Sequence, residues 1–303
     1  MTSSNPQVTT KRKRLASLAL AMAVAVTSAL PVQAQDAAAL KSRHAALRDA
    51  LANNAFARPL VLESSERADG LRGDIHARID QPFAVVGAAL QGVDRWCDIL
   101  ILHLNVKQCR GVDSKAADAL QLVIGQKHDQ PLDQAYRFAF AYEVVASRPD
   151  YLQVQLSADQ GPLGTSGYRI VLEVAALDAR RSIVHLSYAY SFGLAARVAM
   201  QGYLVTLGRD KVGFSVIGSK ADGQPQYIGG TRGVIERNTM RYYLAIEAYL
   251  GALSLPPAQQ FEKRLADWQS GVERYPVQLR ELERGEYLAM KREQVRRQQA
   301  AGG

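Results

Sequence analysis

Apolar and polar side chains alternate over many short stretches of the chain, the pattern of strands that bury one face. Residues 71–80 show it clearly, with Leu71, Ile75 and Ile79 on one face and charged residues between them. Tight turns, such as the one at 147–150, separate neighbouring stretches, so the strands form an antiparallel meander. The predicted strands are 60–66, 71–80, 99–110, 119–126, 134–147, 150–157, 168–177 and 182–192.

Two of these strands carry aromatic rings at every second residue. The first set is Tyr136, Phe138, Phe140 and Tyr142, and the second is Tyr188, Tyr190 and Phe192. Successive strand side chains point to opposite faces, so each set lines one face of the sheet. Each ring removes roughly 150–250 Å² from water when it is buried. This face therefore needs a cover, which is a helix, an apolar ligand or both.

Helical periodicity appears between and after the strands. We predict a helix at 36–56, a helix starting at Pro82, a short one from Asp94 through Trp96, and a helix at 193–207. A further strand is predicted at 211–217. The longest helix, 231–253, has an inward stripe that includes Asn238, Tyr242 and Tyr249, and it is the predicted cover of the aromatic face.

The last part of the chain, 258–303, is highly charged and has apolar residues at heptad-like spacing. Pro276 interrupts its backbone, so two helices are expected. One alternative is that this amphipathic arm packs on its own domain. The other is that it docks on an envelope protein or a second copy through 258–290. The apolar stripe consists of Phe261, Leu265, Trp268, Val272, Tyr275, Leu279 and Leu282.

The first 34 residues follow the pattern of a secretory signal peptide, with a basic cluster, an apolar run and small residues. The cluster is 11–14, the run is 15–30, and cleavage is expected near Ala34. The run is shorter than the ~20 residues of a membrane anchor, which is the alternative. We expect a periplasmic or secreted protein. Without this segment the net charge falls from +8 to 8 − 4 = +4, and no basic patch interleaved with aromatics indicates a nucleic-acid partner.

The chain has two cysteines, Cys97 and Cys109. An oxidising compartment favours a disulfide between them, which closes a short loop and stabilises the fold by about 2–3 kcal/mol. Two buried free thiols are the alternative.

The sequence contains no recognisable catalytic, metal-binding or phosphate-binding motif. The histidines are scattered, and His103 and His185 lie in apolar strands, where a histidine is usually a satisfied core residue. No catalytic residue, metal or cofactor is therefore predicted. The glycines of 229–233 suit either a tight turn or an anion at a helix N-terminus. Glu236 and Asn238, on a helix needed for packing, need either a polar ligand head or a structural network.

The order of strand, helix pair, antiparallel meander and long helix resembles the helix-grip fold of the START and Bet v 1-like superfamily, which includes polyketide cyclase-like proteins. The resemblance rests on 73–83, on Asp94-Arg95-Trp96 and on the final helix. It implies an α+β fold in which a curved antiparallel sheet wraps a long C-terminal helix around an apolar cavity. The helix-grip domain would be 60–255, between an N-terminal helix at 35–59 and the tail 256–303. The segment 193–217 lies where the simplest members have little.

The resemblance and the aromatic face together predict an exported binding or transfer protein for a hydrophobic, lipid-like small molecule. Two alternatives remain open. One is a small-molecule enzyme that uses Glu236, His185 or tyrosines as acid and base groups, and the other is an envelope interaction protein that acts through its tail. The predicted ligand contacts are Trp96, Tyr136, Phe138, Phe140, Tyr142, Tyr188, Tyr190, Phe192, Glu236, Asn238, Tyr242 and Tyr249.

Overall fold

The computed structural model describes residues 1–2, 37–113, 117–193, 197–198, 200, 202 and 211–302. The chain divides into two units, Met1–Ala34 and Gln35–Gly303, and the fold below is that of the second unit. In the described residues, no helix is both long enough and apolar enough to cross a bilayer.

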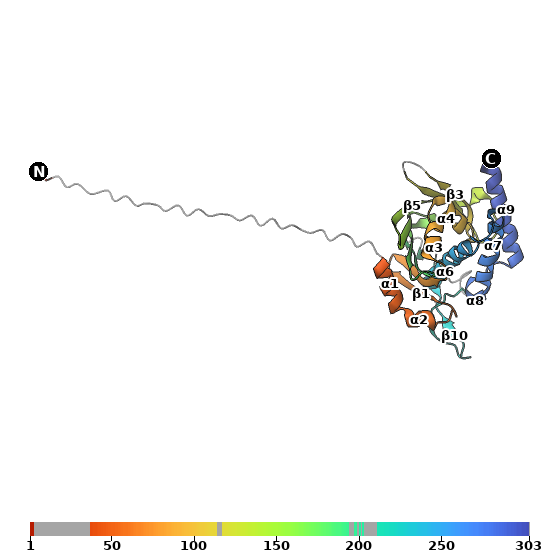
Figure 1. Cartoon of the computed structure of the whole chain (residues 1–303), viewed down its shortest axis with the longest axis horizontal. Coiled ribbons are helices and arrows are strands. Elements are labelled where there is room, and N and C mark those ends of the chain that lie inside the picture. Colours follow the sequence, from red (N-terminus) through yellow and green to blue (C-terminus); the bar gives the residue numbers. More distant parts are fainter. Residues whose placement is uncertain are drawn as a thin grey trace. The chain divides into compact units, whose positions relative to one another are not determined.

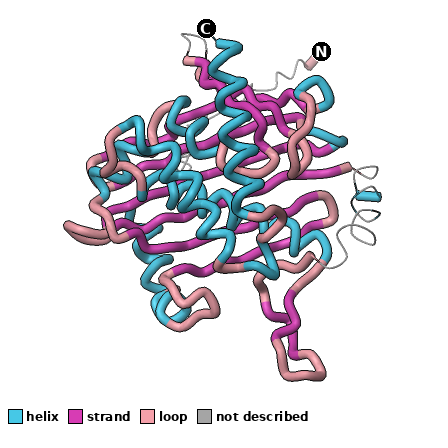
Figure 2. The backbone as a smooth tube through the Cα atoms, turned by 90° about the vertical axis from the view of Figure 1, so that its right-hand side faces the viewer, coloured by secondary structure: helices cyan, strands magenta, loops and turns pink. Residues whose placement is uncertain are grey.

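Eight antiparallel strands form one curved sheet in the order β1-β2-β8-β7-β6-β5-β4-β3 (Figure 2). All strand pairs except β2 with β8 are sequence neighbours, which confirms the predicted meander. The strands are β1 (Leu60–Arg67), β2 (Gly70–Ile79), β3 (Val106–Val112), β4 (Ala119–Ile124), β5 (Tyr136–Arg148), β6 (Tyr151–Gln160), β7 (Thr165–Ala176) and β8 (Ser182–Phe192).

The long helix α6 (Gly230–Gly251) lies against one face of this sheet and packs on β1, β2 and β8 (Figure 1). Gly73 of β2 permits the close approach, because a Cβ atom there would lie 2.2 Å from Oγ1 of Thr239. The predicted α+β helix-grip architecture, a curved antiparallel sheet wrapped on a long helix, is confirmed. We call the face that α6 covers the inner face, and the opposite one the outer face.

Two short helices, α3 (Phe83–Ala89) and α4 (Val93–Leu100), connect β2 to β3. The strand predicted at 99–110 is wrong in its first half, because α4 continues to Leu100 and β3 starts at Val106. The physical reason is complete burial: all residues of 99–104 are buried, so the segment has no alternation. An unbroken apolar run fits a buried helix end as well as a strand.

The C-terminal tail folds back on its own domain as α7 (Pro257–Glu273), α8 (Pro276–Leu279) and α9 (Arg284–Gly302). Helix α7 packs on α6, and α9 packs on α7 and β3. Trp268 and Tyr287 are buried and stack with ring centroids 4.7 Å apart. The apolar stripe is therefore used largely within the chain, and docking of 258–290 on a partner or second copy stays a prediction.

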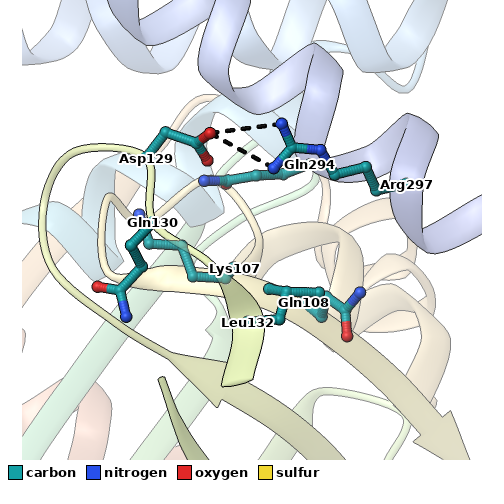
Figure 3. Close-up of a pocket in the computed structure, with 7 residues that line it drawn as sticks. All are labelled: Lys107, Gln108, Asp129, Gln130, Leu132, Gln294 and Arg297. Carbon is teal, nitrogen blue, oxygen red and sulfur yellow. Dashed lines mark hydrogen bonds and ion pairs between the residues drawn. The ribbon is translucent and has the colours of Figure 1, made fainter. Parts of the chain in front are cut away.

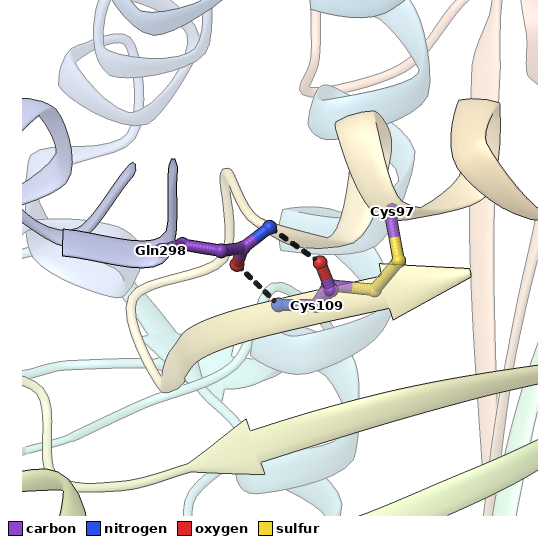
Figure 4. The surroundings of a disulfide bond; sticks show 3 residues. All are labelled: Cys97, Cys109 and Gln298. Carbon is purple, nitrogen blue, oxygen red and sulfur yellow. Dashed lines mark hydrogen bonds between the residues drawn. A yellow bond between two sulfur atoms is a disulfide. The ribbon is translucent and has the colours of Figure 1, made fainter. Parts of the chain in front are cut away.

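The predicted disulfide is present and joins Cys97 of α4 to Cys109 of β3 (Figure 4). The side-chain amide of Gln298 forms two hydrogen bonds with the backbone of Cys109. The N–H of Cys109 donates to Oε1 of Gln298 at 3.0 Å, and Nε2 of Gln298 donates to the carbonyl oxygen of Cys109 at 2.7 Å. Because β3 is an edge strand, this amide satisfies backbone groups that could otherwise pair with another chain.

The remaining elements belong neither to the eight-stranded sheet nor to α6. The helix predicted at 36–56 is divided into α1 (Ala37–Ala46) and α2 (Arg48–Ala52), and Leu40 of α1 packs on the outer face against Tyr151 and Ile183. The strand predicted at 211–217 is shifted: β9 (Val216–Ser219) pairs only with β10 (Pro225–Tyr227) in a separate two-stranded sheet. The helix predicted at 193–207 lies largely outside the described residues.

Candidate functional site

Aromatic rings from β5, β7, β8 and α6 meet on the inner face of the sheet. Neighbouring rings in this group have centroids 4.7–6.5 Å apart, and the contacts form one continuous network from Phe138 to His103. Tyr242 connects the sheet to α6, because its ring lies 5.1 Å from that of Tyr188. We call this group the ring cluster. Its members are His103, Phe138, Phe140, Tyr168, Tyr188, Tyr190, Phe192 and Tyr242.

The strand register places most of the ring cluster at one end of the sheet. Phe192 ends β8 and pairs with Thr165, the first residue of β7, while Ile124 at the end of β4 pairs with both Val106 and Tyr136. The loops 101–105 and 125–135 are therefore at this same end. The first turns of α6 lie there too, since Thr231 donates a hydrogen bond to Glu66 near the end of β1. The rings therefore lie at the end of the sheet where these loops connect to the strands.

Solvent reaches part of the ring cluster. Tyr188 and Tyr190 are only 5% and 6% exposed, but Tyr168, Phe192 and Tyr242 are partly exposed. Asn238, one turn before Tyr242 on α6, is partly exposed as well. The inner face is therefore covered by α6 without being sealed at this end.

Tyr188, Tyr190 and Tyr242 contribute three phenolic hydroxyls to the ring cluster. Burial raises the pKa of Tyr188, Tyr190 and Tyr242, so each hydroxyl keeps its proton and can donate a hydrogen bond. None of the three has a hydrogen-bond partner among the residues that the structure describes. This end of the inner face is therefore suited to a molecule that combines an apolar body with polar atoms.

His103 adds a further unpaired group beside Tyr242. Its ring stacks on that of Tyr242 at 4.9 Å, and Nδ1 accepts the backbone N–H of Asn105 at 3.2 Å. Burial lowers the pKa of His103 well below its usual value, and the charges of Arg241 and Lys291 lower it further. The neutral ring therefore carries its proton on Nε2, which is buried and unpartnered in the described part of the chain.

The structure separates several of the predicted contact residues from the ring cluster. Trp96 is a core residue of α4 and donates from Nε1 to the carbonyl oxygen of Leu90 at 2.9 Å. The hydroxyl of Tyr142 accepts the backbone N–H of Gly92 at 2.7 Å. Tyr249 faces α7, where the guanidinium of Arg264 lies 4.4 Å from its ring centroid. These three rings support the fold at other positions.

Glu236 is a structural anchor in this arrangement. Its buried carboxylate accepts hydrogen bonds from the hydroxyls of Ser64 and Ser215 at 2.6 and 2.7 Å. It also accepts the backbone N–H groups of Phe214 and Ser215 at 2.6 and 2.9 Å. Four donors occupy this carboxylate, so it fixes the segment before β9 to α6 and β1. Of the alternatives for Glu236, the geometry supports the structural network.

Two members of the ring cluster were not predicted from the sequence. Tyr168 follows Gly167 and shares its strand face with Ile170 and Leu172, so the period of two could have placed it with the rings. His103 was assigned to a strand, whereas it lies in the loop between α4 and β3. No periodic signal identifies a residue in such a loop.

The outer face carries a chain of ionisable groups that crosses four adjacent strands. His185 of β8 lies between two carboxylates: Nε2 is 2.8 Å from Oδ1 of Asp74, and Nδ1 is 2.7 Å from Oε2 of Glu173. Arg72 donates two hydrogen bonds of 2.8 Å to Asp74, and the hydroxyl of Tyr151 donates to Glu173 at 2.6 Å. His76 stacks on His185 with centroids 4.3 Å apart. We call Arg72, Asp74, His185, Glu173 and Tyr151 the outer network.

Two surface hollows adjoin β3. The smaller one, between β3, the loop after β4 and α9, has no room for a water molecule, and Arg297 and Asp129 are paired across it at 3.4 Å (Figure 3). The larger has a volume of about 700 Å³ and is lined by Gln108, Arg110, Gln121, Arg137 and Gln298. Arg137 precedes Phe138 on β5 and so points away from the inner face. The lining of the larger hollow also includes Phe138 of the ring cluster, so this hollow borders the rings at that residue.

Comparisons with known proteins give structural resemblance only. No family model matches the chain, and no curated protein matches its sequence. Norcoclaurine synthase from Thalictrum flavum is 12% identical and aligns over 50% of this chain and 87% of its own, with a TM-score of 0.32. The Zhui aromatase/cyclase from Streptomyces sp. R1128 is 11% identical and aligns over 80% of this chain and 99% of its own, with a TM-score of 0.31.

Proposed function

We propose that this chain is an exported protein that binds or transfers a hydrophobic small molecule, held between the inner face of the sheet and α6. The observation that carries the proposal is the ring cluster, which is partly open to solvent and contains phenolic hydroxyls without partners among the described residues, together with the buried, unpartnered Nε2 of His103. An apolar ligand body gains about 0.8 kcal/mol for each methylene that it buries, and the rings offer such a surface.

The rings touch one another in the structure, so a ligand must part some of them as it enters. Tyr168, Phe192 and Tyr242 are suited to this movement because they are only partly buried. The polar atoms of the ligand can then accept hydrogen bonds from the tyrosine hydroxyls. Export remains a prediction from the first 34 residues, and N-terminal sequencing of the protein secreted by its host tests it.

The direct test uses the neutral fluorescent probe N-phenyl-1-naphthylamine, whose emission rises in apolar surroundings. We expect the full chain to bind it, and Phe192→Asp to weaken binding at least about tenfold, because a charge beside the ligand body is costly to bury. Phe192 is partly exposed, so the variant should fold. Val145→Asp is the matched control, since Val145 is 40% exposed. Absence of probe binding to the folded wild-type protein would refute the proposal.

Mass spectrometry of an organic extract supplies the natural ligand. Protein purified under native conditions from its host should carry a small molecule that the Phe192→Asp protein lacks. The enzyme alternative is weakened for Glu236 and His185, because every carboxylate oxygen of the first and both ring nitrogens of the second are already hydrogen-bonded.

A further inference from the structure

A cluster of basic side chains lies at the same end of the sheet as the rings. The ammonium groups of Lys127 and Lys211 lie 2.6 and 3.1 Å from the carboxylate of Glu281. The guanidinium of Arg241 lies 3.0 Å from the same carboxylate. The two lysines and Glu281 together carry a net charge of 2 − 1 = +1, and Arg241 adds a further positive charge. We call Lys127, Lys211, Arg241 and Glu281 the basic cluster.

The basic cluster adjoins the ring cluster through consecutive residues of α6. Arg241 precedes Tyr242, whose ring contacts both His103 and Tyr188. Asn238 accepts a hydrogen bond from Arg241 at 3.3 Å, and Arg237 donates to the carbonyl oxygen of Val212, next to Lys211, at 3.4 Å. Lys127 comes from the loop 125–135, which the register places at the ring end of the sheet. The basic cluster and the ring cluster therefore lie next to each other at one turn of α6.

The electrostatics of this region favour an additional anion. Burial would raise the pKa of Glu281, but Arg241 and Lys127 lower it to about 2, so this carboxylate is always ionised near neutral pH. Burial lowers the pKa of Lys127 despite the attraction of Glu281, and Arg241 and Arg237 lower it further. Like charges held close together repel one another, and an anion relieves the repulsion.

The two lysines can reach a ligand. Their side chains are 29% and 31% exposed, whereas that of Glu281 is 8% exposed. A ligand head can therefore contact the ammonium groups without displacing Glu281. The buried Nε2–H of His103, which has no partner in the described residues, is a further donor next to Tyr242.

We propose that the ligand is an amphipathic acid, whose anionic head lies at Lys127 and Lys211 beside Tyr242 and whose apolar body lies along the ring cluster. This proposal rests on the proposed binding function and narrows its ligand class. Neutral lipids and sterols have no group for the basic cluster, so they should bind more weakly than acids of the same size.

The test measures how well two matched compounds displace N-phenyl-1-naphthylamine from the full chain. Decanoate and 1-decanol have the same carbon chain and differ in the charged head. We expect decanoate to displace the probe at a concentration at least about tenfold lower, because hydrogen bonds between charged groups are stronger than those of a neutral hydroxyl. In Lys127→Gln/Lys211→Gln this preference should fall to within about twofold, with 1-decanol unchanged.

Lys263→Gln is the matched control, because Lys263 is an exposed lysine of α7 that pairs with Asp267. If the double variant does not fold, Lys211→Gln alone should reduce the preference about threefold, since this lysine is more exposed. Equal displacement by both compounds, or a preference that survives in the double variant, would overturn the acid assignment while leaving the binding function intact. Failure of the probe to bind the wild-type protein would overturn both.

Discussion

The two faces of the sheet differ in whether their polar side chains have hydrogen-bond partners within the protein's described residues. On the outer face, His185 has both ring nitrogens hydrogen-bonded, and each of its partners has a further partner. On the inner face, Tyr188, Tyr190 and Tyr242 have no hydroxyl partners in the described residues, and His103 keeps one nitrogen unpaired. A completed network holds strands together, whereas unpaired donors beside partly open rings are typical of a binding surface.

The largest effect should come from breaking the outer network at its buried end. Glu173 is 1% exposed and binds both His185 and Tyr151, so Glu173→Gln removes a buried charge that His185 needs. We expect the free energy of unfolding to fall by about 3 kcal/mol, as when one partner of a buried ion pair is removed. Urea-induced unfolding followed by circular dichroism measures it.

Glu143→Gln provides the control for that change. Glu143 is an exposed residue of β5, and its replacement should alter the free energy of unfolding by less than about 0.5 kcal/mol. A small effect of Glu173→Gln, equal to that of the control, would show that the outer network does not stabilise the sheet. The difference between the two faces would then have no consequence for the free energy of unfolding.

A smaller and more direct comparison removes one hydroxyl from each face. In Tyr151→Phe the hydrogen bond to the carboxylate of Glu173 is lost, and we expect about 2 kcal/mol of destabilisation. In Tyr188→Phe no protein hydrogen bond is lost within the described residues, so stability should stay within about 0.5 kcal/mol or increase. Both rings are buried, which makes the pair well matched. Equal losses in the two variants would contradict the assignment of an unpaired inner hydroxyl.

Much of the fold could be predicted from the sequence because one-sided burial leaves a period of two. The strands 71–80, 168–177 and 182–192 were placed within a few residues, and the alternation of Tyr188 and Tyr190 with polar residues gave the correct inner face. The prediction failed at 99–104, where every side chain is buried and no period exists. It also failed at 211–217, where only Val216 and Ile217 lie in a strand, and that strand belongs to a small separate hairpin.

The candidate site was predictable only in part, because it depends on contacts between distant segments. The rings of β5 and β8 are predicted from the sequence, but the separate positions of Tyr142 and Trp96 follow from their contacts with Gly92 and Leu90. The partners of Glu236 come from β1 and from the segment before β9, far from it in sequence. The sequence predicts the same role, a satisfied core residue, for His103 and His185. In the structure both ring nitrogens of His185 are hydrogen-bonded, whereas Nε2 of His103 has no partner in the described residues.

The most gradual effect is a pH dependence of stability that the stacked histidines of the outer face impose. Burial would lower the pKa of His185, but hydrogen bonds to Asp74 and Glu173 raise it above 6.5. Its contribution to stability is therefore complete below pH 6.5 and is lost as the pH rises through the folded-state value. Burial lowers the pKa of His76 to about 3, with added repulsion from His185 and Arg43. Its contribution is complete above pH 6.5 and is lost as the pH falls toward 3.

The two shifts together predict maximal stability of this face near pH 6.5, with a slope of at most about 1.4 kcal/mol per pH unit for each histidine. His76→Phe should flatten the acidic side between pH 6.5 and about 3 and leave the alkaline side unchanged. Tyr188→Phe on the inner face should change neither side, because a tyrosine whose pKa is raised by burial does not titrate there. Urea unfolding at a series of pH values distinguishes these profiles. An acidic slope that persists in His76→Phe would assign it to other groups, such as the carboxylate of Asp74, whose pKa is lowered by hydrogen bonds from His185 and Arg72 despite its burial.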